Sequence, residues 1–272
     1  MYRLLALDLD GTVVTRERRI TEPVRRAVAE AQAAGVYVTV ATGRVFRTAL
    51  PFARELGLGG ALICCQGAVI REAHTRDLVH HTPLPPALAA EAITLLHRPG
   101  LCVMAYIDDT LCLVEDGEGF DGFVRRWGAP DPRHVRVSPA LAEQALATPP
   151  TKVMFFGDPS VIDREFVRVA AHFESRLTVV RSDPTIGELT APGSSKGVAL
   201  AALAARLSLA PGEVIAIGDE ENDVPMLRWA GLGLAMGNAP AVVQRAANAV
   251  IPSVDEDGVA WAIEEHILRG MR

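Results

Sequence analysis

Lysine is nearly absent from this sequence. Of 27 basic residues only Lys152 and Lys196 are lysines, and the others are arginines. The 33 acidic residues outnumber the basic ones, which gives a formal net charge of −6. The basic excess of a protein that binds a polyanion is therefore missing, and we expect no nucleic acid as the main partner.

Cysteine is scarce and does not occur in a metal-binding pattern. Cys64, Cys65, Cys102 and Cys112 lie in apolar, strand-like stretches, with no C-x-x-C pair and no histidine at zinc spacing. This pattern predicts reduced cysteines in a core, and not a disulfide framework or a zinc site.

Long apolar runs are also missing. No stretch approaches the ~20 residues that a membrane-spanning helix needs. The first apolar run reaches Asp8 too early for the hydrophobic region of a signal peptide. We therefore expect a cytoplasmic protein with no membrane partner.

Strands and helices alternate in the two outer parts of the chain. The apolar runs predict buried strands, and the amphipathic stretches between them predict helices. Alternation of this kind is typical of an α/β fold with a parallel sheet covered on both faces. The predicted strands are 4–7, 36–41, 61–65, 214–217 and 232–235, and the predicted helices are 21–35, 195–207 and 259–268. Thr21 is expected to cap the first helix.

The pattern changes near Pro83, and we expect an inserted α+β domain at 83–187 within a core of 1–82 and 188–272. Strands are expected at 101–107, 110–114, 152–156 and 177–181, with helices at 87–97 and 161–174. Asp108-Asp109 is predicted to form a hairpin turn. We expect hinges at 83–86 and 186–192 and an insert that acts as a lid selecting the substrate.

Polar clusters follow three predicted strands of the core: residues 8–12, 42–44 and 218–223. In an open parallel sheet the functional crevice lies outside the carboxyl ends of the strands, so these clusters should meet. Four carboxylates would then be crowded together, which is unfavourable without a cation. The oxygen-only ligand set points to Mg²⁺. The four are Asp8, Asp10, Asp219 and Asp223, although any one aspartate could instead be a cap or turn former.

A carboxylate-bound Mg²⁺ suits a phosphorylated substrate, and other polar groups fit that substrate. Thr42 offers a hydroxyl and Gly43 an unobstructed N–H at a strand end. Lys196 stands at the expected start of a helix, where dipole and side chain both favour an anion, although it could be an ordinary solvated lysine. Arg44 and Arg47 could likewise face phosphate or solvate a helix.

These motifs, in this order, resemble those of the haloacid dehalogenase (HAD) superfamily. The resemblance rests on Asp8-x-Asp10-Gly11-Thr12, Thr42-Gly43, Lys196 and Gly218-Asp219-x-x-Asn222-Asp223. The segments 233–239, 246–248 and 255–260 are similar to its Cof-type sugar-phosphatase branch. The resemblance implies a Rossmann-like core carrying an inserted α+β cap domain, and a Mg²⁺-dependent phosphatase acting on a small phosphorylated metabolite.

The resemblance also implies a role for each site residue. Asp8 would be the nucleophile and Asp10 the general acid and base. Mg²⁺ would be held by the Asp8 side chain, the Asp10 backbone carbonyl and Asp219, with Asp223 orienting the metal shell. The phosphoryl oxygens would be held by Leu9 N–H, Thr42, Gly43, Lys196 and Asn222.

Several alternatives remain open at this point. The same site could serve a sugar phosphomutase, or a phosphatase dedicated to a phosphorylated disaccharide or glycerate derivative. A non-catalytic binding protein could retain the fold, although a nucleophile paired with an acid–base group argues against it. Gln66 stands where the branch usually has asparagine, so its effect is undetermined, as is the oligomeric state.

Overall fold

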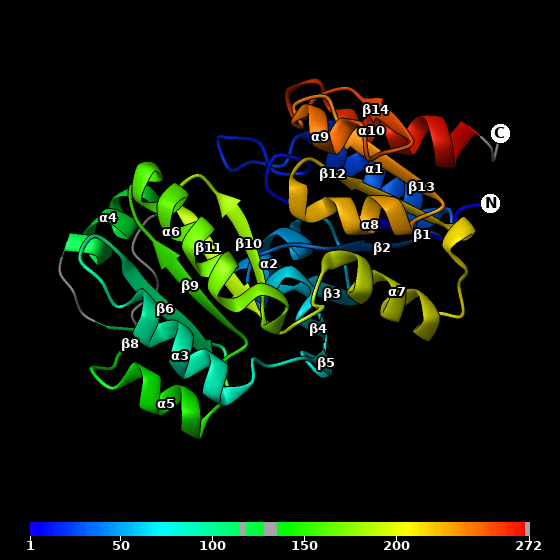
Figure 1. The fold of residues 1–272 in the computed structure, drawn as a ribbon. Coiled ribbons are helices and arrows are strands. Elements are labelled where there is room, and N and C mark those ends of the chain that lie inside the picture. Colours follow the sequence, from blue (N-terminus) through cyan, green and yellow to red (C-terminus); the bar gives the residue numbers. More distant parts are fainter. Residues whose placement is uncertain (115–117, 128–134, 270–272) are drawn as a thin grey trace. The chain divides into compact units, whose positions relative to one another are not determined.

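The computed structural model describes residues 1–114, 118–127 and 135–269. The chain folds into two compact units. The first joins Met1–His80 to Ser195–Arg272, and the second is His81–Ser194 (Figure 1).

A five-stranded parallel sheet forms the centre of the first unit. Its strand order is β14-β13-β12-β1-β2, and every neighbouring pair is parallel. The central strands consist of short apolar runs that are buried on both faces, as expected for a sheet between two helical layers. The strands are β1 (Leu4–Leu7), β2 (Tyr37–Val40), β12 (Val214–Gly218), β13 (Leu232–Met236) and β14 (Ala249–Ile251).

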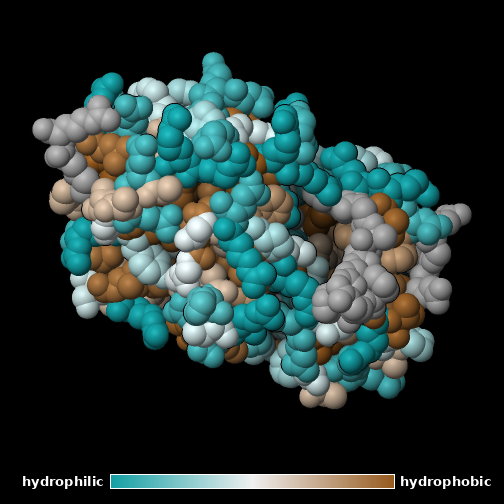
Figure 2. Space-filling model, turned by 180° about the vertical axis from the view of Figure 1, so that it is seen from behind, coloured by the Kyte–Doolittle hydropathy of each residue, from teal (hydrophilic) through white to brown (hydrophobic). Residues whose placement is uncertain are grey.

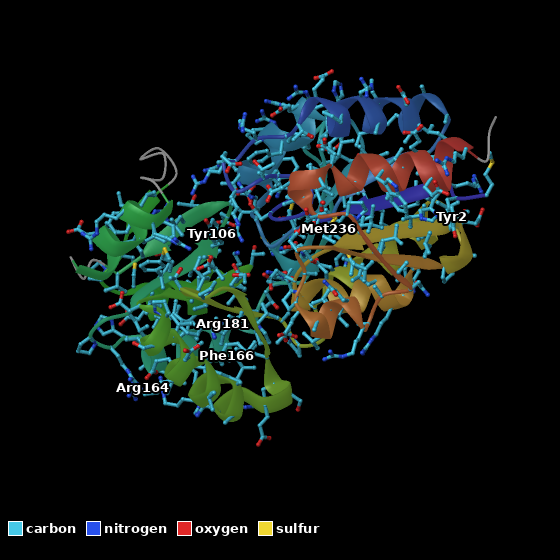
Figure 3. All side chains as sticks on the ribbon, turned by 90° about the horizontal axis from the view of Figure 1, so that it is seen from above. Tyr2, Tyr106, Arg164, Phe166, Arg181 and Met236 are labelled. Carbon is cyan, nitrogen blue, oxygen red and sulfur yellow. The ribbon has the colours of Figure 1, made fainter. Side chains whose placement is uncertain are left out.

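Helices cover both faces of this sheet. Figures 1 and 3 show α1 and α10 on one side and α7 and α8 on the other. Leu200 and Leu203 of α7 and Leu227 of α8 pack against Leu4 and Val214 of the strands. The helices are α1 (Glu22–Ala33), α2 (Phe46–Glu55), α7 (Lys196–Arg206), α8 (Val224–Trp229), α9 (Ala241–Gln244) and α10 (Gly258–Ile263), which continues as a π-helix (Glu264–Leu268).

A small sheet extends the core beyond β2. It contains β3 (Ala61–Cys64), β4 (Val69–Glu72) and β5 (Leu78–His81), in that order, and β3 and β4 are antiparallel. A parallel bridge between Ala41 and Ile63 joins β3 to the end of β2. The turn that follows β3 therefore lies beside the turn that follows β2.

The second unit is a mixed sheet packed on helices. Its strand order is β10-β11-β9-β6-β7-β8, antiparallel except between β7 and β8. One core joins α3, α5 and α6 to alternate residues of β6 and β9, such as Val103 and Phe155. The strands are β6 (Cys102–Ile107), β7 (Thr110–Leu113), β8 (Val135–Val137), β9 (Lys152–Phe156), β10 (Thr178–Asp183) and β11 (Ile186–Thr190), and the helices are α3 (Pro86–Leu96), α4 (Glu118–Trp127), α5 (Leu141–Ala147) and α6 (Pro159–Phe173).

Most of the predicted elements are confirmed, with ends that differ by a few residues. Asp108 and Asp109 both have positive φ, 49° and 58°, as a tight hairpin turn between β6 and β7 requires. All four cysteines are buried, and none of them forms a disulfide within the described residues. The predicted α/β core with an α+β insert is confirmed.

Two local predictions are wrong. The segment 186–192 is not a connection, because 186–190 is strand β11, which pairs with both β9 and β10 and extends the insert beyond residue 187. Thr21 does not cap α1 with its side chain. Its hydroxyl donates to Asp257 Oδ1 at 2.5 Å instead.

Hydrophilic residues cover most of the face shown in Figure 2, with hydrophobic residues between them. Within the described ranges, no helix is long and apolar enough to cross a membrane.

Candidate active site

Three strand ends bring the predicted site residues together. Asp8 directly follows β1, Thr42 lies just beyond β2, and Asp219 directly follows β12. Because β1 lies between β2 and β12 and all three are parallel, their carboxyl ends meet at one edge of the sheet. The Asp8 N–H donates to Ile217 O at 2.9 Å, which fixes the start of the first loop against β12.

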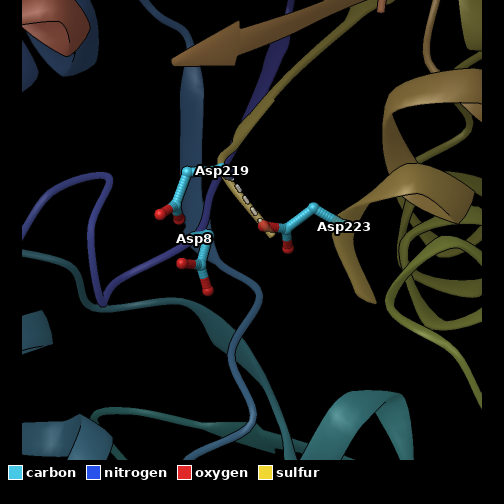
Figure 4. Close-up of side chains that lie close together, drawn as sticks. All are labelled: Asp8, Asp219 and Asp223. Carbon is cyan, nitrogen blue, oxygen red and sulfur yellow. Dashed lines mark hydrogen bonds between the residues drawn. The ribbon is translucent and has the colours of Figure 1, made fainter. Parts of the chain in front are cut away.

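A buried cluster of three carboxylates lies at this edge. One oxygen of each of Asp8, Asp219 and Asp223 lies within 4.8 Å of the others (Figure 4). Burial, opposed in part by Lys196, raises the pKa of Asp8 well above its ordinary value. Burial and the neighbouring Asp223 raise the pKa of Asp219 to about 7. Burial is the main cause of both shifts and the neighbouring carboxylates add to it, so a cation bound among them would favour their ionised forms.

Lys196 lies between two of the three carboxylates. Its Nζ is 2.6 Å from Asp8 Oδ1 and 2.5 Å from Asp223 Oδ1, and the side chain is only 2% exposed. Burial alone would lower the pKa of Lys196, but Asp223 and Asp8 raise it above its ordinary value. The lysine is the first residue of α7, and the Ser195 hydroxyl caps that helix by accepting from Val198 N–H. A solvated lysine is therefore excluded.

Asp223 has both carboxylate oxygens engaged by protein groups. Oδ1 accepts from Lys196, and Oδ2 accepts from the backbone N–H groups of Asp219, at 2.9 Å, and Glu220, at 3.0 Å. A Cβ at Gly218 would lie 2.5 Å from Asp223 Cγ, so this position requires glycine. Asp223 is thus placed to brace the loop that carries Asp219.

The Asp219 carboxylate is held on both sides. Thr12 Oγ1 donates to its Oδ1 at 3.0 Å, and Asn238 Nδ2 donates to its Oδ2 at 3.2 Å. Asn238 Nδ2 also donates to Gly11 O at 2.9 Å, which ties together the loops after β1, β12 and β13. Sequence reasoning did not assign roles to Thr12 and Asn238. Asn238 could have been found, since it also lies just after a strand of the same sheet.

The predicted crowding of four carboxylates is wrong for the Asp10 side chain. That side chain is 56% exposed and forms a bidentate ion pair with Arg44, with Nε to Oδ2 at 2.7 Å and Nη2 to Oδ1 at 2.5 Å. The guanidinium also lies over the Phe52 ring, 4.6 Å from its centroid. Arg44 therefore binds Asp10, which was not one of the two alternatives considered for this arginine.

The groups predicted to bind phosphate border the same edge. Thr42 is 1% exposed, and its Oγ1 accepts from Arg44 N–H at 3.1 Å. The carbonyl of buried Leu9 accepts from the N–H groups of residues 12, 13 and 14, which curls the first loop tightly. Asn222 Nδ2 donates to Gln66 Oε1 at 2.9 Å, so Asn222 is linked to the turn after β3.

Nearly the whole chain matches a known family: residues 5–263 fit the model of the haloacid dehalogenase-like hydrolases. The chain belongs to this family. Two similar members are the pyridoxal phosphate phosphatase YbhA of Escherichia coli and the 5-amino-6-(5-phospho-D-ribitylamino)uracil phosphatase YcsE of Bacillus subtilis. Each is 30% identical over 98% of this chain, covering 99% of YbhA and 96% of YcsE.

Solved structures of the family share the fold. A haloacid dehalogenase-like hydrolase from B. subtilis superimposes with a TM-score of 0.84, at 26% identity, over 97% of this chain and all of the other.

The residues present fit the metal ion that these hydrolases use. The donors are carboxylate oxygens, which suit a hard cation, and a cation would offset the repulsion among these buried carboxylates. Asp223 already has both oxygens engaged, whereas Lys196 takes only one oxygen of Asp8. Asp8 and Asp219 are therefore the side chains best able to hold a hard cation.

Proposed function

We propose that this hydrolase is a Mg²⁺-dependent phosphatase that removes phosphate from a small phosphorylated metabolite through a phosphorylated Asp8. The observation that carries the proposal is the position of Asp8. Its carboxylate follows β1, is buried, and lies within reach of both Lys196 Nζ and the Asp219 carboxylate. A nucleophile beside fixed positive charge is the arrangement that attack on a phosphate dianion needs.

The proposed reaction uses two aspartates, Asp8 and Asp10. A carboxylate oxygen of Asp8 attacks phosphorus, an Asp8 O–P bond forms, and the bond from phosphorus to the leaving alcohol oxygen breaks. Asp10 gives its proton to that oxygen. Water then attacks the aspartyl phosphate, Asp10 takes a proton from the water, and Asp8 leaves as a carboxylate with release of inorganic phosphate.

Asp10 must first part from Arg44 to act as an acid. Arg44 engages both oxygens of the Asp10 carboxylate, so neither can contact the leaving-group oxygen in this arrangement. The exposure of Asp10 leaves its carboxylate accessible to an arriving substrate. Opening of this ion pair is therefore part of the proposed cycle.

The phosphoryl oxygens would be bound by groups at the strand ends. Lys196 has a buried positive charge, and in this proposal Thr42, Gly43 N–H, Leu9 N–H and Asn222 would supply the remaining donors. Donors fixed before the substrate arrives stabilise charge at phosphorus without reorganisation.

Mg²⁺ would be held by the side chains of Asp8 and Asp219 and the backbone carbonyl of Asp10. When bound, it supplies positive charge that neutralises phosphate oxygens. Thr12 and Asn238 keep the Asp219 carboxylate oriented for this role, and Asp223 holds the Asp219 backbone.

The insert is proposed to select the substrate, because the core residues described above would bind only the phosphate group and the metal ion. YbhA is named for pyridoxal phosphate and YcsE for a phosphoribityl compound. The name of YcsE and the resemblance to the sugar-phosphatase branch favour a phosphomonoester of a sugar or a sugar-like polyol, and the name of YbhA adds pyridoxal phosphate as a compound to test. A mutase on the same fold is the second candidate, and dependence on a bisphosphate activator would identify it.

A substrate screen tests the proposal. Purified protein is assayed for phosphate release from sugar phosphates, nucleotides, flavin mononucleotide and pyridoxal phosphate, with Mg²⁺ or with EDTA. We expect release from at least one small phosphomonoester in Mg²⁺ only, and none from Asp8→Asn. Release that continues in EDTA would refute the metal assignment, and no release from any compound would refute the phosphatase proposal.

A further inference from the structure

The turn after β3 has an unusual backbone. Three consecutive residues, Cys65, Gln66 and Gly67, have positive φ values of 52°, 58° and 92°. This region is unfavourable for most residues that carry a side chain. Glycine is required at position 67, where a Cβ would lie 2.2 Å from Ser195 O. Such conformations persist where surrounding structure enforces them, and they concentrate at functional sites.

Backbone hydrogen bonds hold this turn against the loop after β2. Gln66 N–H donates to Thr42 O at 3.2 Å, and Cys65 N–H donates to Arg44 O at 2.9 Å. The left-handed backbone at residue 66 is thus fixed relative to the Thr42-Gly43 pair.

The Gln66 side chain extends from this turn between two loops of the active site. A Cβ built on Gly43 would lie 2.4 Å from Gln66 Nε2, so the amide packs directly on the glycine backbone. At its other atom, Gln66 Oε1 accepts from Asn222 Nδ2 at 2.9 Å. The residue is only 2% exposed. One buried side chain therefore touches both Gly43 and Asn222.

The length of glutamine matters for this contact. Asparagine adopts positive φ more readily than glutamine, so backbone energetics alone favour the shorter amide at position 66. Asparagine is shorter by one methylene, about 1.5 Å of bond length, and could not keep both contacts from the same backbone. Glutamine at position 66 is explained if the length of its side chain, which contacts both Gly43 and Asn222, matters more than its backbone preference.

We propose that Gln66 is a positioning residue that sets the distance between the Gly43 N–H and the Asn222 amide, and so shapes the part of the site that receives the phosphoryl oxygens. This inference rests on the proposed function, in which both groups bind phosphate. The Asn222 amide is held through its nitrogen, because its Oδ1 is buried and has no hydrogen-bond partner within residues 1–114, 118–127 and 135–269. The hydrogen bond to Gln66 uses one of the two Nδ2 hydrogens, and in the proposal the other donates to a phosphoryl oxygen.

The test compares Gln66→Asn with Gln32→Asn, a matched shortening of a half-buried glutamine in α1 that lies outside the site and donates to Gly57 O. Thermal unfolding, kcat and KM are measured with p-nitrophenyl phosphate, and calorimetry measures inorganic phosphate binding in Mg²⁺. We expect Gln66→Asn to unfold at the same or a higher temperature than the parent. Phosphate binding and kcat/KM should nevertheless fall by about 10-fold, as for one lost hydrogen-bond contact. Gln32→Asn should match the parent in all four measurements.

A double-mutant cycle tests whether the effect passes through Asn222. In an Asn222→Ala background, Gln66→Asn should add little further loss of phosphate affinity. If the losses of phosphate affinity in the two variants were additive, the inference would be overturned. The same holds if Gln66→Asn lost activity only because its unfolding temperature was lower. Unchanged phosphate affinity in Gln66→Asn would overturn it as well. These outcomes differ from failure of the proposed function, in which the parent itself releases no phosphate from any substrate.

Discussion

Gly11 allows a direct test of how tightly Asp219 must be placed. Gly11 has a φ of 82°, and a Cβ there would lie 2.2 Å from Asp219 Oδ2 and 2.9 Å from its Cγ. Ordinary contacts begin at 3.4 Å, so Gly11→Ala must displace the carboxylate by about 1 Å. The carboxylate cannot move freely, because Thr12 and Asn238 hold its two oxygens.

Gly35 provides a matched control. Its φ is 83°, and an added Cβ would have nothing within 4 Å. Alanine at either position has the same backbone cost, roughly 1–2 kcal/mol. Urea unfolding in EDTA should therefore show a similar loss of unfolding free energy for Gly35→Ala, and a similar or larger one for Gly11→Ala.

The two variants should differ in activity. A displacement of about 1 Å at a catalytic group can cost ~10²-fold, so Gly11→Ala should lose about that much in kcat/KM and require more Mg²⁺ for half-maximal rate. Gly35→Ala should keep the parent's rate and Mg²⁺ dependence wherever it is folded. If both variants had the same kcat/KM and Mg²⁺ dependence, the placement of Asp219 would not be critical and the reasoning would be refuted.

Three further predictions concern the same site. EDTA should abolish turnover, and Mg²⁺ should restore it. Ca²⁺ should support turnover poorly, because it takes more ligands at longer distances. Equal rates in Ca²⁺ and Mg²⁺ would contradict this prediction. In metal-free protein the folded state raises the pKa of Asp219 to about 7, so its stabilising contribution is complete below the ordinary carboxyl range and is lost as pH rises through about 7. Urea midpoints in EDTA should show a smaller loss in Asp219→Asn than in the parent, because Asp8, whose pKa is also raised, remains in the variant. Asp10→Asn should lower turnover by ~10²–10⁴-fold. It should still give a burst of about one p-nitrophenolate per site, since this leaving group needs little help from an acid. A slow rate without a burst would argue against Asp10 as the base.

The parallel core and its strand-end residues could be predicted because both depend on local sequence. Continuous apolar runs mark strands buried on both faces, and polar residues directly after them mark the functional edge. Asp8, Thr42 and Asp219 follow strands in this way and lie at that edge. The buried position of Lys196 agrees with its expected place at the start of α7.

Strand β11 was missed because a buried ion pair interrupts its apolar pattern. Glu188 is 3% exposed and pairs with Lys152 Nζ at 2.6 Å, a partner that only the folded sheet supplies. Gly187 weakens the strand signal further, although the Phe155 ring fills the space beside it.

The ion pair of Asp10 with Arg44 and the contacts of Gln66 were also beyond prediction. The ion pair depends on the parallel pairing of β1 with β2, and the contact of Gln66 with Gly43 depends on the bridge between Ala41 and Ile63. A left-handed glutamine has no sequence signal of its own, since that residue type seldom adopts positive φ. Local patterns identified which residues carry the chemistry, and long-range pairing determined how those residues are held.

Trapping the phosphorylated protein tests the central claim most directly. Asp10→Asn is mixed with p-nitrophenyl phosphate and Mg²⁺, quenched in acid within the first turnover, digested and analysed by mass spectrometry. The account predicts phosphate on the peptide that contains Asp8, removed by hydroxylamine and absent when Asp8→Asn is added to the variant. Substantial turnover by the Asp8→Asn single variant, with no phosphorylated peptide in either protein, would contradict it and point to direct attack by water.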